Sequence, residues 1–227
     1  MESIRLGNYK LYSFDKIDST QDFALELVAS GRATNRTIIL ADAQFAGRGR
    51  YRRAWVSHHG NLYVSFIFSA PARDPRLSYS IAVAIAETLI SFGIHPEIKW
   101  PNDIRVDGKK ISGTLIEYAR DFVIIGIGLN IKTNPTVKDY QTTKTDNFVK
   151  GLSRDAVLTA LKDKMDLWMA RDFASVRARW MELAANLNAT IMYRGTPAVL
   201  CGINDDGALV LRRGTEYFMI YGDEIGA

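Results

Sequence analysis

Four arginines, two glycines and a tryptophan lie close together in the segment AGRGRYRRAW. Gly47 and Gly49 lack a Cβ, so the backbone there can approach a ligand closely. Arg48 and Arg50 flank Gly49, and guanidinium groups bind carboxylate or phosphate oxygens through paired hydrogen bonds. Trp55 offers a flat face for an aromatic ring. The segment suits a phosphate, a carboxylate or an acidic partner, although a solvated basic hairpin tip explains the loop alone equally well.

The same loop differs from the common nucleotide-binding fingerprints. Arg52 stands where the third glycine of G-x-G-x-x-G would fall, and no Gly-Lys-Ser/Thr of a P-loop follows. If the loop binds a nucleotide, it does not bind it as a dinucleotide fingerprint or a P-loop does.

A second candidate segment, KWPNDIRVDGKKISG, contains Asp-Gly, a strong signal for a two-residue hairpin turn. Cross-strand partners share a face, which predicts one apolar and one polar face. The apolar face holds Ile104, Val106 and Ile111, and the polar face holds Asp103, Arg105, Lys110 and Ser112. A carboxylate with two cations suits an anionic ligand. The alternative is a half-exposed hairpin with solvated charges, and a one-residue slip in register would exchange the faces.

Hydrophobic periodicity and turn signals predict the elements that position these segments. We expect helices over residues 17–31 and 76–93, and two more within 153–185 that are separated near Asp172. Ser19, with Asp22 three residues later, resembles a capping box at the start of the first helix. We expect strands over 36–44, 60–70 and 122–131, and a surface loop over 133–150.

The pattern changes after Asn186. Short strand-like runs at 198–203, 208–213 and 217–222 alternate with Gly and Asp turns. They predict a β-barrel of roughly 40 residues, too small to be stable without the larger domain. The sequence therefore predicts domains 1–185 and 186–227.

Composition limits the class of protein. The chain has 227 residues, 47% hydrophobic and 24% charged, which fits one globular domain with a small appendage. No apolar run reaches the roughly 18 residues of a membrane span, and the start lacks the pattern of a signal peptide. One cysteine excludes an internal disulfide, so the simplest prediction is a cytoplasmic protein. A net charge of +4 does not by itself indicate a nucleic-acid partner.

Four segments in this order resemble a biotin–protein ligase, the enzyme that attaches biotin to carboxylase carrier domains. They are STQ at 19–21, QFAGRGRYRRAW at 44–55, KWPNDIRVDGKKISG at 99–113 and GIGLNI at 126–131. The resemblance covers about residues 10–185, and the GRGR and KWPND motifs are its most specific parts.

The resemblance implies an α+β fold like that of class II synthetases. Helices flank a mixed, mainly antiparallel sheet, and an SH3-like barrel follows. The implied reaction is ATP-dependent. Biotin's carboxylate attacks the α-phosphate, giving biotinyl-5′-AMP and pyrophosphate, and a lysine of a biotin carboxyl carrier protein domain then takes the biotinyl group. Mg²⁺ is expected with ATP, and no metal-binding residues are assigned.

The resemblance also assigns residues to roles. Arg50 and Lys110 are the expected catalytic residues. The implied biotin site contains Ser19, Thr20, Gln21, Gln44, Gly47, Arg48, Gly49, Arg50, Lys110 and Gly113. The implied ATP site contains Arg50, Arg53, Trp55, Asn102 and Asn130. Asp103 is expected to assist the acceptor lysine.

Two residues depart from the family pattern. Gln21 stands where Asn commonly follows Ser-Thr, and Arg52 replaces a glycine of the loop. The resemblance is to the short form without an N-terminal DNA-binding domain, since Tyr12 already lies in a predicted strand; we therefore expect no DNA or membrane partner. A homodimer through a sheet edge is also expected.

Two alternatives remain at this point. A lipoate–protein ligase or octanoyl transferase shares the ancestry but lacks the GRGR and KWPND segments. A biotin-binding sensor without catalysis is disfavoured because Arg50 and Lys110 are both retained.

Overall fold

The computed structural model describes residues 3–221, which fall into two compact units. The first unit comprises Met1–Arg73 and Val106–Thr159, and the second comprises Asp74–Arg105 and Ala160–Ala227. These units do not coincide with the expected division after residue 185, which remains a prediction.

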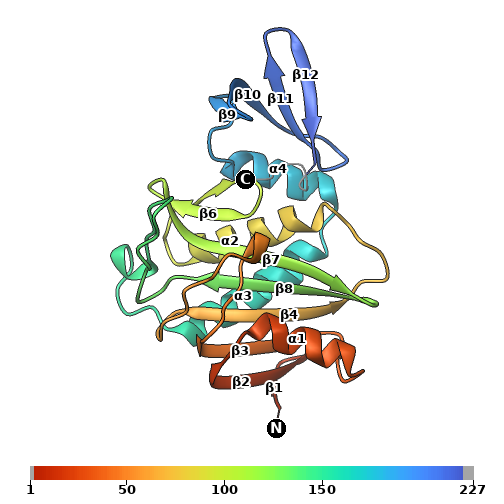
Figure 1. Cartoon of the computed structure of the whole chain (residues 1–227), viewed down its shortest axis with the longest axis vertical. Coiled ribbons are helices and arrows are strands. Elements are labelled where there is room, and N and C mark those ends of the chain that lie inside the picture. Colours follow the sequence, from red (N-terminus) through yellow and green to blue (C-terminus); the bar gives the residue numbers. More distant parts are fainter. Residues whose placement is uncertain (1–2, 222–227) are drawn as a thin grey trace. The chain divides into compact units, whose positions relative to one another are not determined.

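The first unit is built on a sheet with the strand order β1-β2-β3-β4-β8-β7 (Figure 1). These strands are β1 (Ile4–Leu6), β2 (Tyr9–Ile17), β3 (Thr37–Gln44), β4 (Leu62–Ser69), β7 (Lys109–Ala119) and β8 (Phe122–Leu129). β2 and β3 run parallel, and the other neighbouring pairs are antiparallel. The predicted α+β class with a mixed, mainly antiparallel sheet is confirmed.

Helix α1 (Thr20–Ala29) connects the parallel pair, as a parallel connection requires. It begins where the sequence predicts, because the Ser19 Oγ accepts a hydrogen bond from the Asp22 backbone N–H at 3.2 Å. Its Leu27 packs in a core cluster with Ile39 and Ile124 of the sheet. The helix therefore covers one face of the central strands, and β4 is buried on both faces.

The predicted hairpin turn lies between β6 (Asp103–Val106) and β7. Asp107 and Gly108 have φ values of 51° and 71°, the left-handed pair that a tight two-residue turn requires. One part of the predicted polar face is wrong. Ser112 is fully buried, and its Oγ donates to the Gly128 carbonyl at 2.7 Å, so it does not contribute to an exposed polar wall.

Two short 3₁₀ turns complete the first unit, η1 (Arg50–Arg52) and η2 (Thr145–Asn147). The helix α3 (Arg154–Met169) begins in this unit and ends in the second. The stretch over 133–150 is mostly irregular, as predicted.

The second unit contains helices α2 (Leu77–Ser91) and α4 (Phe173–Leu183), with the antiparallel pair β5 (Glu97–Lys99) and β6. The rings of Tyr79 on α2 and Trp180 on α4 meet edge to face at 5.5 Å. Helix α4 begins at Asp172, whose carboxylate accepts from the Ser175 N–H at 2.8 Å, so the predicted helix break is confirmed.

The C-terminal strands form an open four-stranded sheet with the order β12-β11-β10-β9. They are β9 (Thr190–Tyr193), β10 (Thr196–Ile203), β11 (Leu209–Arg213) and β12 (Glu216–Ile220). β9 and β12 lie at opposite edges, so closure into a barrel is not confirmed. No helix in the described part of the chain is long and apolar enough to cross a membrane.

Candidate functional site

Three glycines leave one area of the first unit's sheet without side chains. Gly113 of β7 pairs with Gly128 of β8, and Leu115 pairs with Gly126. Because cross-strand partners share a face, Gly113, Gly126 and Gly128 form a continuous bare area, which we call the glycine floor. Sheets rarely lack three adjacent side chains unless another group approaches closely.

Two side chains lie against the glycine floor. A Cβ on Gly128 would stand 2.3 Å from Cε2 of Trp55, and a Cβ on Gly126 would stand 2.6 Å from Oε1 of Gln21. Both distances are far below van der Waals contact, so only glycine permits this packing. The structure thus brings together Gln21, Gly113 and Trp55, which lie far apart in the sequence.

Lys110 lies at the edge of the same floor. Its Nζ would be 3.2 Å from a Cβ on Gly113 and is 5.4 Å from the centroid of the Trp55 ring. On another side, Nζ is 5.1 Å from the ring centroid of Tyr140. Two aromatic faces therefore stabilise the ammonium group of the predicted catalytic lysine.

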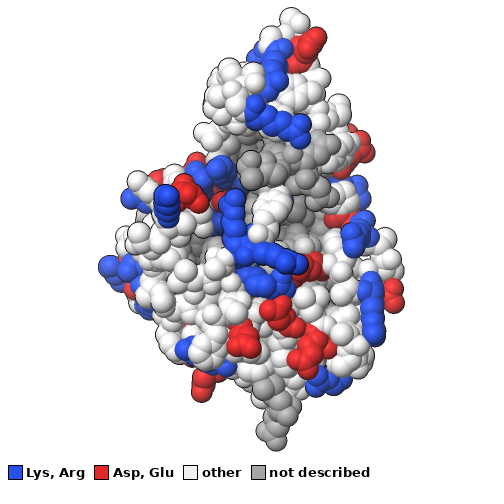
Figure 2. Space-filling model, viewed as in Figure 1, with Lys and Arg blue, Asp and Glu red and all other residues white. Residues whose placement is uncertain are grey.

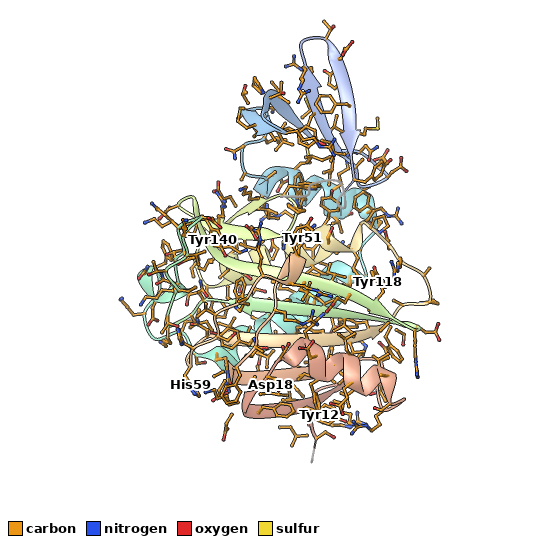
Figure 3. All side chains as sticks on the ribbon, viewed as in Figure 1. Tyr12, Asp18, Tyr51, His59, Tyr118 and Tyr140 are labelled. Atoms are coloured by element: carbon orange, nitrogen blue, oxygen red, sulfur yellow. The ribbon has the colours of Figure 1, made fainter. Side chains whose placement is uncertain are left out.

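Sequence reasoning missed Tyr140, which lies in the loop after β8 (Figure 3). This loop runs beside Lys110, whose N–H donates to the Gln141 carbonyl and whose carbonyl accepts from Thr143 N–H, both at 2.9 Å. No periodicity marks the segment, so its pairing with β7 could not be predicted.

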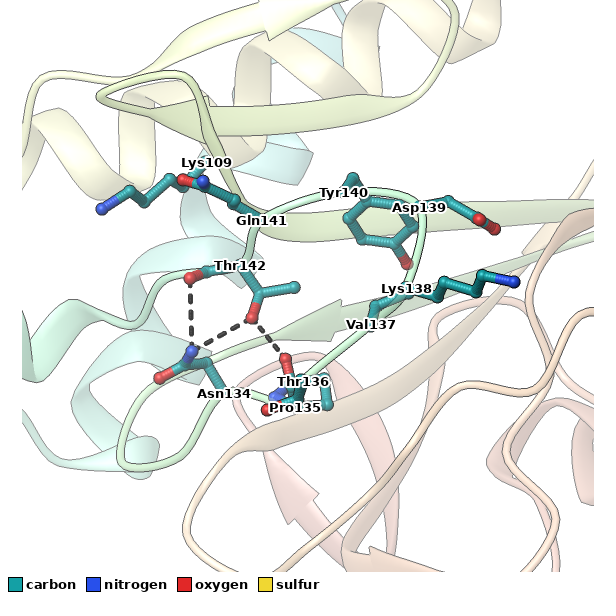
Figure 4. A pocket seen from close by; sticks show the side chains of 10 residues that line it. All are labelled: Lys109, Asn134, Pro135, Thr136, Val137, Lys138, Asp139, Tyr140, Gln141 and Thr142. Carbon is teal, nitrogen blue, oxygen red and sulfur yellow. Dashed lines mark hydrogen bonds between the residues drawn. The ribbon is translucent and has the colours of Figure 1, made fainter.

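The same loop encloses a separate hollow, seen in Figure 4. Asn134 Nδ2 donates to the Oγ1 of Thr142 at 3.0 Å, which ties the two ends of the loop together. The lining residues are Lys109, Asn134, Pro135, Thr136, Val137, Lys138, Asp139, Tyr140, Gln141 and Thr142. None of the predicted site residues lines this hollow.

A buried polar network surrounds the start of α1. The Oε1 of Gln44 accepts from the backbone N–H of Thr20 at 2.8 Å, and Gln44 Nε2 donates to Ser57 Oγ at 2.9 Å. Ser65 Oγ lies 2.9 Å from Thr20 Oγ1 and 3.0 Å from Gln21 Oε1, so its one proton can be donated to either oxygen. Ser65 was also missed, because it lies within an apolar strand. The network places the predicted biotin-site residues Thr20, Gln21 and Gln44 together.

The arginine loop, residues 46–55, connects β3 to this site. A Cβ on Gly47 would stand 2.5 Å from the Trp55 carbonyl, and Trp55 N–H donates to the Gly47 carbonyl at 2.8 Å. Tyr51 and Arg52 have φ values of 55° and 57°. Arg52 therefore adopts the left-handed backbone that glycine would adopt more easily, at a local cost in strain.

The arginines of the loop have different surroundings. The Arg48 guanidinium binds Asp22 Oδ1 at 2.6 Å and Glu117 Oε2 at 3.1 Å. Burial alone would lower the pKa of Arg48, but hydrogen bonds and charge attraction from Glu117 and Asp22 raise it above its ordinary value. Arg50 Nη2 donates to the Tyr51 hydroxyl at 3.0 Å. Figure 2 shows Lys and Arg side chains gathered on one face with acidic side chains beside them.

The remaining predicted residues divide between the units. Gly49 and Arg53 close the loop through a 2.8 Å hydrogen bond from the Gly49 N–H to the Arg53 carbonyl. Asn102 and Asp103 belong to the second unit, where Asp103 opens β6, and their roles stay predictions.

Among the described residues of the first unit, four buried polar side-chain atoms lack a hydrogen-bond partner: Arg48 Nε, Trp55 Nε1, Asn130 Oδ1 and Arg154 Nε. Asn130 follows β8, and its Nδ2 donates to the Thr143 carbonyl at 3.0 Å. A buried acceptor without a partner is costly unless a ligand or water supplies a donor. The ligand contact of Asn130 stays a prediction.

Asn61 holds the backbone that follows Asn130. Its Oδ1 accepts from the N–H groups of Ile131, Lys132 and Thr133 at 2.8, 3.0 and 3.1 Å, and the side chain is buried. We expect Asn61→Ala to lower the free energy of unfolding by about 3 kcal/mol, because three backbone donors lose their acceptor. Urea denaturation measures this. Asn35→Ala, which removes an exposed acceptor from a single backbone N–H, that of Ser69 at 3.1 Å, should lose less; equal losses would contradict the explanation.

The biotin/lipoate A/B protein ligase family matches residues 13–134 of the chain. The bifunctional ligase/repressor BirA of Bacillus subtilis is 31% identical over 97% of this chain and 74% of its own length. The biotin–[acetyl-CoA-carboxylase] ligase of Paracoccus denitrificans is 33% identical over 87% of this chain and 92% of its own length.

Solved structures show the same fold. The biotin protein ligase of Aquifex aeolicus, in complex with biotin and ATP, is similar with a TM-score of 0.81 and 24% identity over 93% of this chain and 95% of that one. The Leishmania major enzyme in complex with biotinyl-5-AMP has a TM-score of 0.73 and 22% identity over 95% and 99%. Sequence and fold agree that the chain belongs to the biotin/lipoate A/B protein ligase family, within which its curated relatives are biotin–protein ligases.

Proposed function

We propose that the protein activates biotin with ATP to biotinyl-5′-AMP and transfers the biotinyl group to a lysine of a biotin carboxyl carrier protein domain. The surroundings of the glycine floor carry this proposal, because a buried polar network, the Trp55 ring and the Lys110 ammonium come together there. The hydroxyl and amide groups around Thr20 and Gln44 suit the ureido end of biotin, and Lys110 suits its carboxylate.

In the first half-reaction, a carboxylate oxygen of biotin bonds to the α-phosphorus of ATP, and the bond to pyrophosphate breaks. The cations of Lys110 and Arg50 would stabilise the negative charge on the phosphate and bring two anions together. Adenine would stack on the outer face of the half-buried Trp55 ring. Asn130 would donate to or accept from the nucleotide through its amide.

In the second half-reaction, the neutral amine of the acceptor lysine bonds to the acyl carbon. AMP departs with the electron pair of the broken C–O bond, and the amine loses its proton. No covalent bond to the enzyme is needed. Mg²⁺ bound to the ATP phosphates would neutralise part of their charge.

The cellular location, the homodimer and the C-terminal barrel are also parts of this proposal. A cytoplasmic location is supported by the single cysteine, and an exposed edge strand β1 supports a homodimer. Closure of residues 186–227 into an SH3-like barrel is proposed from family resemblance alone.

Transfer of biotin tests the proposal directly. The protein is incubated with ATP, biotin and a carrier domain, and the product is probed with streptavidin. We expect label only when all components are present. Tight biotin binding without transfer would instead indicate a sensor, and transfer of lipoate in place of biotin would indicate a lipoate ligase.

Arg50→Ala should slow adenylate formation and speed loss of the adenylate into solution. Removing one charge-assisted contact to a phosphate changes each rate by about tenfold. Rapid-quench measurement of adenylate formation and release checks both. Arg73→Ala is the matched control, since the Arg73 guanidinium lies 5.5 Å from the ring centroid of Tyr118, as that of Arg50 lies 5.1 Å from the ring centroid of Tyr51. Unchanged rates in Arg50→Ala would remove the residue from the mechanism.

A further inference from the structure

We propose that Glu117 is a positioning residue that holds the arginine loop over the glycine floor by binding Arg48. This inference rests on the proposed function, because it concerns how that site keeps its adenylate. Glu117 is not among the residues that the motifs single out. It lies on β7, on the same face as Gly113, because the two positions are an even number of residues apart.

The contact between Glu117 and Arg48 is bidentate. Arg48 Nη1 donates to Glu117 Oε1 at 3.3 Å, and Nη2 donates to Oε2 at 3.1 Å. Such a pair of hydrogen bonds fixes the guanidinium plane as well as its position. Since Arg48 lies between Gly47 and Gly49, this contact helps to determine where the start of the loop lies.

Asp22 is the second carboxylate on Arg48, with an Nη2–Oδ1 distance of 2.6 Å. Its side chain is 49% exposed, whereas those of Arg48 and Glu117 are 28% and 30% exposed. Solvent screens the more exposed pair more strongly. Glu117 is therefore the main anchor, and Asp22 supports it from α1.

Glu117 also fixes Gln21, the residue that departs from the family's usual Asn. Gln21 Nε2 donates to Glu117 Oε2 at 2.9 Å, while Gln21 Oε1 accepts from Ser65 Oγ at 3.0 Å. These two bonds set the orientation of the amide over Gly126. One carboxylate thus connects the polar end of the site with the arginine loop.

Two carboxylates neutralise the charge of Arg48, so this arginine suits attachment of the loop better than recognition of an anion. A loop held at Arg48 shields a bound adenylate, while a detached loop lets it leave. The proposal therefore concerns retention of the intermediate more than the chemical step.

The test uses Glu117→Gln, which keeps the shape of the side chain and removes its charge. Labelled adenylate is formed on the whole protein without acceptor, and its release is followed after a chase. We expect release about tenfold faster than from the wild type, the effect of weakening one charge-assisted contact. The rate of adenylate formation should change much less.

Glu26→Gln is the matched control. Glu26 lies on the same helix as Asp22 and pairs with Arg32 at 2.9 Å, but both partners are well exposed. The Glu26→Gln variant loses the same charge, but Glu26 does not contact the arginine loop. Its rate of adenylate release should therefore equal that of the wild type. Equal release from the wild type and Glu117→Gln, with both proteins folded, would overturn the proposal.

A double-mutant cycle with Arg48→Gln distinguishes positioning from direct ligand contact. If Glu117 acts through Arg48, the double variant releases adenylate no faster than Arg48→Gln alone. Multiplying effects would mean that Glu117 acts independently of Arg48, through Gln21 or on the ligand itself, which contradicts the proposal.

Trypsin cleavage of the free protein tests the loop attachment even if no adenylate forms. We expect faster cleavage after Arg50, Arg52 or Arg53 in Glu117→Gln than in Glu26→Gln. Absence of adenylate in the wild type would refute the proposed function alone, whereas equal cleavage in both variants would refute the role of Glu117.

Discussion

Lys110→Ala is expected to reduce adenylate formation by about 10²- to 10³-fold while the protein stays folded. The ammonium group lies at the edge of the glycine floor, 5.4 Å from the ring centroid of Trp55 and 5.1 Å from that of Tyr140. Without it, the site loses a fixed positive charge that opposes the repulsion between biotin's carboxylate and the α-phosphate. Stopped-flow or quench measurement of adenylate formation gives the rate.

Lys10→Ala provides the matched control, because Lys10 also lies over an aromatic ring, Tyr12, at 5.0 Å, but on β2. It should retain wild-type activity. Lys110→Arg keeps the charge with a different shape and should recover part of the rate. If Lys110→Ala merely unfolds more easily and keeps its specific activity, Lys110 has only a structural role.

Gly128→Ala is expected to have the second largest effect, through displacement of Trp55. The new Cβ would stand 2.3 Å from Cε2 of the indole, and Gly128 does not have a positive φ, so the backbone itself accepts alanine. The ring must therefore move. Overpacking of this kind costs about 1–3 kcal/mol, and we expect a matching loss in binding of biotin and ATP. Calorimetry measures the binding of each.

Ile127→Val tests whether any change in β8 has the same effect. Ile127 is buried on the opposite face of the strand, and losing one methylene there costs about 1 kcal/mol of stability. We expect Ile127→Val to bind biotin and ATP as tightly as the wild type does. If Gly128→Ala binds both ligands as well as Ile127→Val does, the glycine floor is not the ligand site.

Local signals predicted much of the fold. The Ser19 cap, the Asp-Gly turn and the break at Asp172 all depend on contacts within a few residues, and each is confirmed. Periodicity also located β3, β4 and β8, because these strands are apolar over most of their length.

Residues that act through pairing across the sheet could not be predicted. Ser65 and Glu117 join the site only because β4, β8 and β7 are neighbours in a particular register. Tyr140 joins it because an irregular loop pairs with Lys110. The alternation argument likewise misplaced Ser112, since it could not show that the polar face near Gly128 is covered.

The biotin-dependent exchange of labelled pyrophosphate into ATP is the most direct test of the proposed function. The assay reports adenylate formation at the site around Lys110 and Arg50 without an acceptor protein. We predict exchange with biotin, none without it, and none with lipoate or octanoate. No exchange with biotin, or exchange with lipoate instead, would contradict the account.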